Sequence, residues 1–485
     1  MSVGNRTAIL TLSRFANYGL MLISPLVLVR LLSVQQFGQY REFLLYASIL
    51  QSVAVFSIND SLLYCVPACP ASPWRLARQT VVLTLCSSLL VVGTLALVDG
   101  FSGGAVLHGY LAPVALYTLF SVNVDFWEYF WLANRRPGAL FVYSTSRLIA
   151  RLGVVIVTAA LTRDVTAMIW ALVVLEAIRI AVASIAFVLL DQSRREPGLQ
   201  EPWREQLRFC LPSGLASMLS LLNKSLSSLA VTRVLGPAAL AQYSIGRFGE
   251  PLVLTLRNSV SSVVLPEMVR RDRQSREKPL DLWQRATAVN AIFLFPVAIL
   301  VGRYAEPLVT AVFGASYHEG ALVMQIYAVM VIRECCDFAP ALRAINRTRP
   351  LVESNIAAMV ACAIALAVLL PLQGVLGAIW ALVISSFVDL AWAAVRTMRL
   401  YRTGLRDLVP WNSLGRIAFC AIAGAVLIAS PLWTEELGFG GVLLGSAIYV
   451  LAYGALLLLV RVPEAQSLYA WAKRLVLRPQ SQARP

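Results

Sequence analysis

Apolar runs of about twenty residues follow one another along nearly the whole chain of 485 residues. An α-helix needs about 20 apolar residues to cross the hydrocarbon of a bilayer, so each run is a candidate membrane span. Only 14% of the residues are charged, against about 25% in soluble domains, which makes lipid the solvent for most of the chain. The sequence therefore predicts an all-α integral membrane protein with about 14 transmembrane helices. The candidate spans are 8–32, 43–64, 80–98, 105–132, 138–161, 165–190, 208–234, 239–265, 286–303, 319–342, 351–371, 373–395, 414–433 and 439–460.

The loops between these runs alternate in charge. Lys and Arg accumulate in the cytoplasmic loops of membrane proteins. With the N-terminus in the cytoplasm, most of the 41 basic residues fall on the inner side, and the outer ends hold only Arg30, Arg41, Arg163, Arg233 and Arg303. We therefore predict that both termini are cytoplasmic. The net charge of +15 is assigned to the membrane surface, and we expect no nucleic-acid partner.

The connections are too short to hold a soluble catalytic domain. The two longest, 191–207 and 266–285, contain neither an Asp-x-Asp pair for a metal and a sugar nucleotide nor a Gly-rich phosphate loop. The eight cysteines are scattered mostly through apolar runs, and the only histidines are His108 and His318, so neither a zinc site nor a disulfide framework is predicted. We expect no enzyme activity, no cofactor and no metal.

An internal repeat divides most of the chain in two. The segment VRLLSVQQFGQY (29–40) can be aligned with TRVLGPAALAQY (232–243), with four identities in twelve positions. Because this offset spans six predicted helices, both halves have the same orientation, as in the parallel repeats of some transporters. The predicted organisation is a six-helix lobe at 1–195, a second at 208–399, an additional helix pair at 414–460 and a basic cytoplasmic tail at 461–485.

These segments also carry a family resemblance. Together with VRLLSVQQFGQY, the segments SSVVLPEMVRR (261–271), FPVAILVGRYAEPLVTAVFGASYHEGALVMQIYA (295–328) and RAINRTR (343–349) resemble the polysaccharide transporter, or oligosaccharide flippase, family of the multidrug/oligosaccharidyl-lipid/polysaccharide (MOP) exporter superfamily. That resemblance implies two six-helix lobes in a V around a central cavity. The two additional helices are more similar to the fourteen-helix lipid II flippases and to some exopolysaccharide exporters.

The resemblance also implies a function. It predicts a multi-pass protein of the bacterial inner membrane that moves a polyprenyl-diphosphate oligosaccharide across the bilayer by alternating access, for O-antigen, capsule or exopolysaccharide assembly. The implied partners are this lipid-linked oligosaccharide, membrane lipids, and the polysaccharide polymerase and chain-length machinery.

Charged residues within the spans are the candidate site, because a charge at mid-bilayer costs at least about 2.5 kcal/mol. Arg147 and Arg151 lie four residues apart on one helix, with Tyr143 one turn earlier. Two like charges on one face repel unless an anion lies between them, and guanidinium groups bind diphosphate through bidentate hydrogen bonds. The alternative is that this pair is neutralised by Asp125 and Glu128 on the preceding helix.

Four other basic residues complete the predicted substrate-binding set. Arg14 and Lys224 come from corresponding helices of the two lobes. Arg257 and Arg333 lie in the second lobe, where Glu334 and Asp337 are close in sequence to Arg333. Two further arginines each have a carboxylate three residues away and are predicted to form structural ion pairs, Arg179 with Glu176 and Arg247 with Glu250.

Five carboxylates within the spans are assigned to ion coupling or to charge balance. A carboxyl group that is desolvated in a helix bundle can load and release a proton, whereas the alternative is simple neutralisation of the arginines. These carboxylates are Asp60, Asp125, Glu128, Asp337 and Asp389. On the helix of Asp125, the aromatic residues Trp127, Tyr129 and Trp131 are typical of anchors at a membrane interface.

Three alternative functions remain open at this level. A multidrug exporter of the same superfamily would need an apolar cavity with a few acids for cationic drugs, and the eight basic residues in the spans argue against it. A membrane-embedded polysaccharide polymerase or ligase would need a large outer loop, and the outer loops are short. A scaffold subunit of an envelope assembly complex would bind a synthase without transport.

Overall fold

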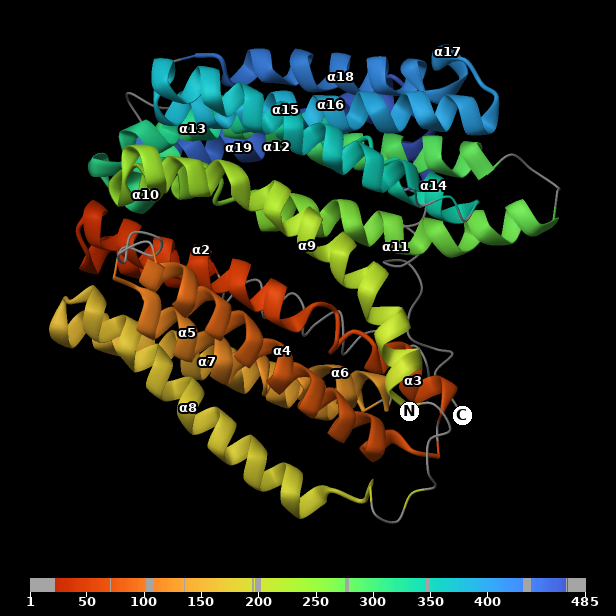
Figure 1. Cartoon of the computed structure of the whole chain (residues 1–485). Helices are drawn as coiled ribbons and strands as arrows, with labels where there is room; N and C mark the ends of the chain where they lie inside the picture. The colour runs from red at the N-terminus through yellow and green to blue at the C-terminus, as the bar shows by residue number, and fades with distance from the viewer. Residues whose placement is uncertain are drawn as a thin grey trace, which may run out of the picture. The chain divides into compact units, whose positions relative to one another are not determined.

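The structure, a computed structural model, describes residues 22–69, 71–101, 109–134, 136–193, 196, 202–274, 279–345, 347, 349–430, 438–467 and 469. Every regular element in this part of the chain is a helix. By its internal contacts the chain forms two compact units, Met1–Ala241 (unit 1) and Gln242–Pro485 (unit 2), and each unit is described by itself (Figure 1).

Nine helices of the described residues are long and apolar enough to cross a membrane. They include seven helices of more than twenty residues and the C-terminal pair, which confirms the predicted all-α membrane fold and makes the chain a multi-pass membrane protein. The count of fourteen stays a prediction. The nine are α4 (Pro73–Phe101), α7 (Pro137–Thr162), α8 (Val165–Leu190), α11 (Glu250–Gln274), α12 (Pro279–Phe313), α15 (Arg349–Gln373), α16 (Val375–Tyr401), α18 (Trp411–Ala425) with the 3-10 turn η3 (Val426–Ile428), and α19 (Gly438–Leu459).

Four predicted spans are each divided into two helices. The second consists of α2 (Val34–Val55) and α3 (Leu62–Ala68), the fourth of α5 (Leu111–Val122) and α6 (Phe126–Ala133), the eighth of α10 (Pro237–Gly246) and α11, and the tenth of α13 (His318–Arg333) and α14 (Ala339–Ala344).

These breaks correct our prediction that each of the four apolar runs is one continuous helix. The breaks in the second, fourth and tenth spans contain Ser, Asn or Asp, whose side chains hydrogen-bond to nearby backbone and so compete with the helix. Ser61 donates to the carbonyl of Ile58, and Asp337 accepts from the backbone N–H of Ala339.

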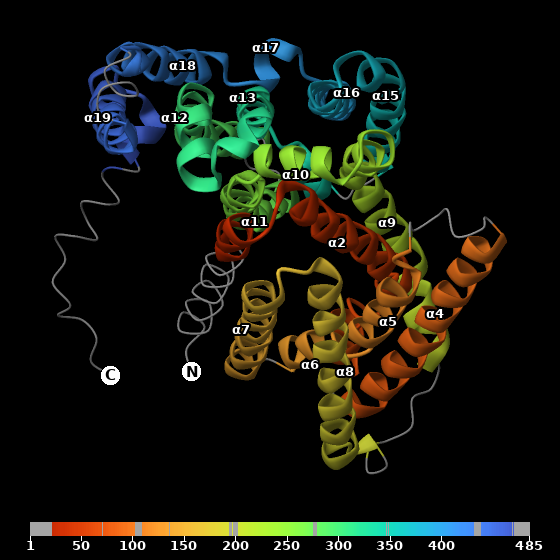
Figure 2. The ribbon, with the colours of Figure 1, turned by 90° about the vertical axis from the view of Figure 1, so that its left-hand side faces the viewer.

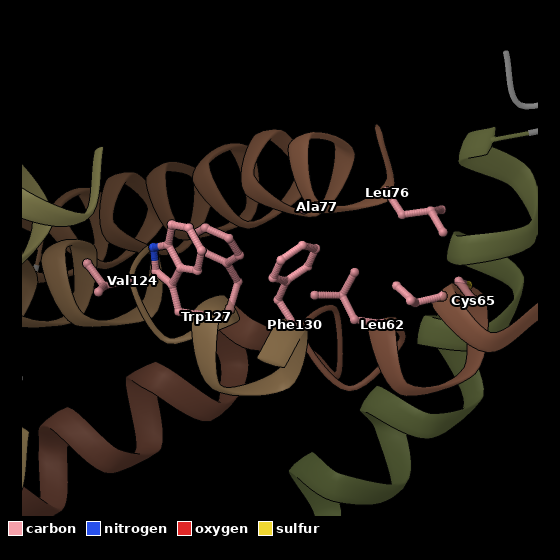
Figure 3. Close-up of a cluster of buried hydrophobic side chains, with 9 residues drawn as sticks. Leu62, Cys65, Leu76, Ala77, Val124, Trp127 and Phe130 are labelled. Atoms are coloured by element: carbon pink, nitrogen blue, oxygen red, sulfur yellow. The ribbon is translucent and has the colours of Figure 1, made fainter. Parts of the chain in front are cut away.

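The core of unit 1 contains the aromatic residues of α6. Trp127 and Phe130 are buried with Leu62 of α3 and Leu76 of α4 in one apolar cluster (Figure 3). Trp127 is only 4% exposed, so the prediction that it anchors the chain at a membrane interface is wrong. Its ring packs inside the protein because the breaks in the second and fourth spans bring α3 and α6 together.

α9 (Pro202–Leu235) also belongs to unit 1. It packs against α2 and α4, and the fully buried amide of Gln206 donates to Ser61 Oγ at 2.7 Å and to Thr80 Oγ1 at 2.8 Å. The observed division into units therefore falls later in the chain than the lobe boundary predicted between 195 and 208. The six-helix lobes inferred from the repeat stay a prediction.

Unit 2 is built around α12. In both views α18 and α19 lie near this helix (Figure 2), and both pack against it. Tyr304 of α12 is buried in one cluster with Ile428, Val442 and Tyr449 of the C-terminal segment. α15 and α16 form the most extensive helix pair of the unit, and the remaining short elements are η2 (Ala315–Tyr317) and α17 (Leu405–Leu408).

The glycine of the segment VRLLSVQQFGQY lets α2 approach the backbone of Pro237 closely, and both residues belong to unit 1. A Cβ at Gly38 on α2 would lie 1.9 Å from the carbonyl oxygen of Pro237. We expect Gly38→Ala to lower the free energy of unfolding by about 1 to 3 kcal/mol, the usual cost of overpacking, because backbone cannot yield as a side chain can. Thermal unfolding of the purified protein measures this change.

A matched control is available on α4. A Cβ at Gly93 would meet no atom within 4 Å, and alanine is a better helix former than glycine by about 1 kcal/mol. Gly93→Ala should therefore leave the unfolding midpoint unchanged or raise it. Equal effects of the two substitutions would show that the close approach at Gly38 is not what makes glycine necessary there.

Candidate functional site

Unit 1 contains an ion-pair network at the break in the fourth span. Asp125 occupies the N-cap position of α6, and Glu128 lies in the first turn of that helix. Arg147 of α7 contacts both carboxylates at 2.8 Å. Arg179 of α8 contacts Asp125 at 3.0 Å and also pairs with Glu176. We call these five residues the unit-1 charge cluster.

Tyr143 ties this cluster to the break itself. Its hydroxyl accepts a hydrogen bond from Arg179 at 3.0 Å and donates to the carbonyl of Val124 at 3.4 Å. Three helices and the interruption between α5 and α6 are thus connected by one polar network. Such a network is stable in a bilayer only while its charges remain paired.

Arg151 stands apart from these ion pairs. It lies one turn beyond Arg147 on α7, and its guanidinium lies over the ring of Tyr117 at 5.9 Å from the centroid. Within the described part of the chain, the structure gives Arg151 no ion pair. The two arginines that the sequence grouped together therefore differ. Arg147 is neutralised by Asp125 and Glu128, as in our alternative interpretation. Arg151 lies in a membrane span, where the described residues give it an aromatic contact and no ion pair.

Replacing Arg147 should show how much its ion pairs with Asp125 and Glu128 contribute to the stability of the protein. Arg147→Ala leaves the partly buried Asp125 and Glu128 without one of their cations, and leaving such a group without its partner costs about 1 to 3 kcal/mol. We expect a large fall in the thermal unfolding midpoint, partly restored by a second substitution, Glu128→Gln, which removes one of the carboxylates left unpaired. If the double variant is less stable than Arg147→Ala alone, the ion pair does not explain the loss.

Unit 2 has a second network at the break in the tenth span. Glu334 is almost fully buried and pairs with Arg257 of α11 and, at 3.2 Å, with Arg333. Arg333 also pairs with Asp389 of α16, and Arg257 lies 3.8 Å from Asp337. These five residues form the unit-2 charge cluster. Arg257 and Arg333, both predicted to contact substrate, are thus held by carboxylates in this structure.

A small cavity with a mixed polar and apolar lining adjoins the unit-2 charge cluster. Its volume is about 10 Å³, which is room for about one water molecule. Asp337 lines it together with Ser261, Thr287, Asn290 and Cys335. Ser261 donates to the Asp337 carboxylate at 3.2 Å, so this carboxylate has a polar partner beside the cavity.

The other predicted site residues lie outside both clusters. Asp60 lies in the break of the second span, near the side chains of Ser57 and Tyr129. Lys224 of α9 is exposed and has no ion pair in the described part of the chain. Arg14 falls outside the described residues. Arg247 pairs with Glu250 at 2.6 Å, and Arg179 pairs with Glu176, so both predicted structural ion pairs are present.

The breaks recur at matching positions of the predicted repeat. They divide the second and eighth spans, and the fourth and tenth. Each break or its border carries a charged residue: Asp60, Arg247, Asp125 and Glu334. Interrupted helices in corresponding positions of two halves are typical of the substrate and ion sites of transporters, because only the ends of broken helices offer free backbone groups within the membrane.

Two features of the site escaped the sequence analysis. The breaks themselves were missed, although the polar run Ser57 to Ser61 and the segment Asn123 to Asp125 were the available signal. The contact of Arg333 with Asp389 was also missed, because these residues are far apart in the chain and no local spacing links them. Among the described residues, no group of three or more His, Cys, Asp or Glu side chains is arranged to hold a metal ion.

Comparison with known proteins identifies a matching family model and solved structures with a similar fold. A family model described as polysaccharide biosynthesis protein matches residues 27–322. A structure of the lipid II flippase MurJ in an inward closed conformation has a TM-score of 0.66 at 12% sequence identity, covering 97% of this chain and 100% of that one. No curated protein sequence matches the chain.

Two transporter structures share the fold at lower similarity. A mutant of the Vibrio cholerae MATE transporter VcmN has a TM-score of 0.54 at 13% identity, covering 83% of this chain and 97% of that chain. An inward-facing multidrug resistance MATE family transporter of the MOP superfamily has a TM-score of 0.53 at 16% identity, with the same coverage. The structural similarities confirm the predicted fold class, and the family model confirms the predicted resemblance to a polysaccharide family.

Proposed function

The chain belongs to the polysaccharide biosynthesis protein family, and from that premise we propose that it is a flippase for a lipid-linked oligosaccharide. The substrate we propose is a polyprenyl-diphosphate oligosaccharide, moved across the bacterial inner membrane for O-antigen, capsule or exopolysaccharide assembly. Both termini are then cytoplasmic. The polymerase and chain-length machinery act on the oligosaccharide after transport, and the chain itself carries out no covalent chemistry.

Arg151 is the observation that supports this substrate best. A guanidinium in a membrane span without a carboxylate partner is costly, and that cost is offset when an anion binds to it. Diphosphate matches the planar donors of arginine, because two of its oxygens can accept parallel hydrogen bonds. The aromatic face of Tyr117, which already lies beside Arg151, provides an apolar wall but no competing negative charge.

The charge clusters have a different role in this proposal. Arg147, Arg257 and Arg333 are bound to carboxylates, so they reach substrate only if those ion pairs open. We propose that the breaks at Asp125 and Glu334 are where the helices move during alternating access, in which the site opens to one side of the membrane at a time. The carboxylates Asp60, Asp337 and Asp389 then balance charge or carry the coupling ion.

A multidrug exporter is the strongest alternative within this fold. Such a protein binds organic cations, which unpaired carboxylates in a span would attract. In the described part of the chain, the carboxylates Asp125, Glu128, Glu334 and Asp389 are occupied by arginines. Of the predicted substrate-binding cations among the described residues, Arg151 and Lys224 have no ion pair, which favours an anionic substrate.

Binding separates these alternatives. Purified protein would be examined by native mass spectrometry with polyprenyl-diphosphate oligosaccharide, with polyprenyl monophosphate and with a lipophilic organic cation. We expect a complex with the diphosphate lipid, a weaker one with the monophosphate and none with the cation. Tight binding of the cation that displaces the diphosphate lipid would favour the multidrug exporter.

A further inference from the structure

Two adjacent cysteines occupy the break in the tenth span, outside every ion pair described above. Cys335 is buried and Cys336 is partly exposed. Their sulfur atoms lie 3.6 Å apart. Cys335 directly follows Glu334 and Cys336 directly precedes Asp337, so the pair lies between two carboxylates of the unit-2 charge cluster.

The helix break is what makes this sulfur contact possible. Successive side chains of an α-helix point about 100° apart around its axis, which separates neighbouring sulfur atoms. α13 ends at Arg333 and α14 begins at Ala339, so the two cysteines lie in the non-helical connection between them.

We propose that Cys335 and Cys336 form a reactive dithiol that closes reversibly to a disulfide between adjacent residues. A low-molecular-weight disulfide serves as the oxidant. The thiolate of the partly exposed Cys336 attacks it, forming a mixed disulfide and releasing one thiolate. The thiolate of Cys335, after losing its proton to water, then attacks the Cys336 sulfur and releases the second thiolate. One oxidant disulfide is thus reduced to two thiols as the cysteine pair is oxidised.

Such a disulfide is easily reduced. Cα atoms of adjacent residues are about 3.8 Å apart, whereas disulfides usually join Cα atoms about 4.4 to 6.8 Å apart. The ring between neighbours is therefore strained, and strained disulfides are the labile and regulatory ones. Reversibility follows from the adjacency of the two residues.

Ring closure has a structural consequence for the unit-2 charge cluster. The carbonyl of Cys335 accepts a hydrogen bond from the buried Asn290 at 3.5 Å, and Cys335 lines the water-sized cavity. Rotating the peptide between the cysteines displaces this carbonyl and pulls on Glu334, which holds Arg257 and Arg333. The dithiol thereby makes the stability of the unit-2 charge cluster depend on redox conditions.

The test uses the full-length protein treated with oxidised glutathione and then with iodoacetamide. Peptide mass spectrometry should show that Cys335 and Cys336 lose alkylation together, with no glutathione attached, and regain it after reduction. Cys335→Ser should retain glutathione on Cys336. Alkylation of both cysteines after oxidation, or a stable glutathione adduct on wild-type Cys336, would overturn the proposal.

Thermal unfolding provides an independent readout. Oxidation should lower the midpoint of the wild type by at least about 2 °C, reversibly, and should leave Cys336→Ser unchanged. The matched control is Cys86→Ser, which replaces an exposed cysteine of α4 and should respond to oxidation as the wild type does. A wild-type midpoint unaffected by a confirmed Cys335–Cys336 disulfide would contradict the link to the charge cluster.

Discussion

Arg151→Ala should reduce transport of a polyprenyl-diphosphate oligosaccharide by about 10- to 100-fold, because a hydrogen bond to a charged group is worth about 1.5 to 3 kcal/mol. Arg151 has no ion pair among the described residues, so removing it leaves no carboxylate there without its ion-pair partner. The thermal unfolding midpoint should therefore change little. Arg151→Lys should retain part of the activity, since lysine keeps the charge but not the planar pair of donors.

The control for this variant lies on the border of the same helix. Arg136 occupies the N-cap position of α7, is exposed and lies over the ring of Trp131. Arg136→Ala removes the same charge from the chain outside the span and should transport at the wild-type rate. Equal loss in both variants would point to a general electrostatic effect, and full activity of Arg151→Ala would remove Arg151 from the site.

Glu334→Ala should destabilise unit 2 by about 3 to 5 kcal/mol, the usual cost of removing one member of a buried ion pair. Glu334 is 5% exposed and lies between Arg257 and Arg333, so its loss leaves two guanidinium groups near each other with fewer counter-charges. A large fall in the thermal unfolding midpoint of the purified protein is the expected result.

An exposed acid on the same segment provides the comparison. Glu319 lies in the first turn of α13 and is exposed. Glu319→Ala should shift the midpoint only slightly, because exposed charges contribute little to stability. A Glu334→Ala protein as stable as Glu319→Ala would show that the unit-2 charge cluster does not hold α11, α13 and α16 together.

The fold could be predicted because the mean hydropathy of a run of about twenty residues identifies a membrane-spanning helix. A run such as 165–190 has the same limits as α8, since only a helix satisfies its backbone in lipid. The breaks were missed for the same reason. The mean hydropathy of a run of about twenty residues hardly changes when three or four of them are polar. The hydrogen bonds of Ser61 and Asp337 that end the helices involve residues within a single turn.

The sequence predicted which charged residues belong to the candidate site better than it predicted which ion pairs they form. A charge in a span is visible in the sequence, and Arg179 with Glu176 follows from helical spacing. The long-range ion pairs cannot be predicted from helical spacing. Arg179 reaches Asp125 and Arg333 reaches Asp389 only because helices distant in sequence pack together, and this packing separates the paired Arg147 from the unpaired Arg151.

Translocation by the pure protein is the most direct test. Wild-type protein would be reconstituted in liposomes that contain a fluorescent polyprenyl-diphosphate oligosaccharide, and a membrane-impermeant quencher would report how much label each leaflet exposes, with protein-free liposomes as the baseline. We predict that label crosses the bilayer faster than the baseline under a proton, sodium or voltage gradient. Label that stays in its original leaflet under all three gradients, with the protein folded, would contradict the proposal that this chain is a flippase for lipid-linked oligosaccharide.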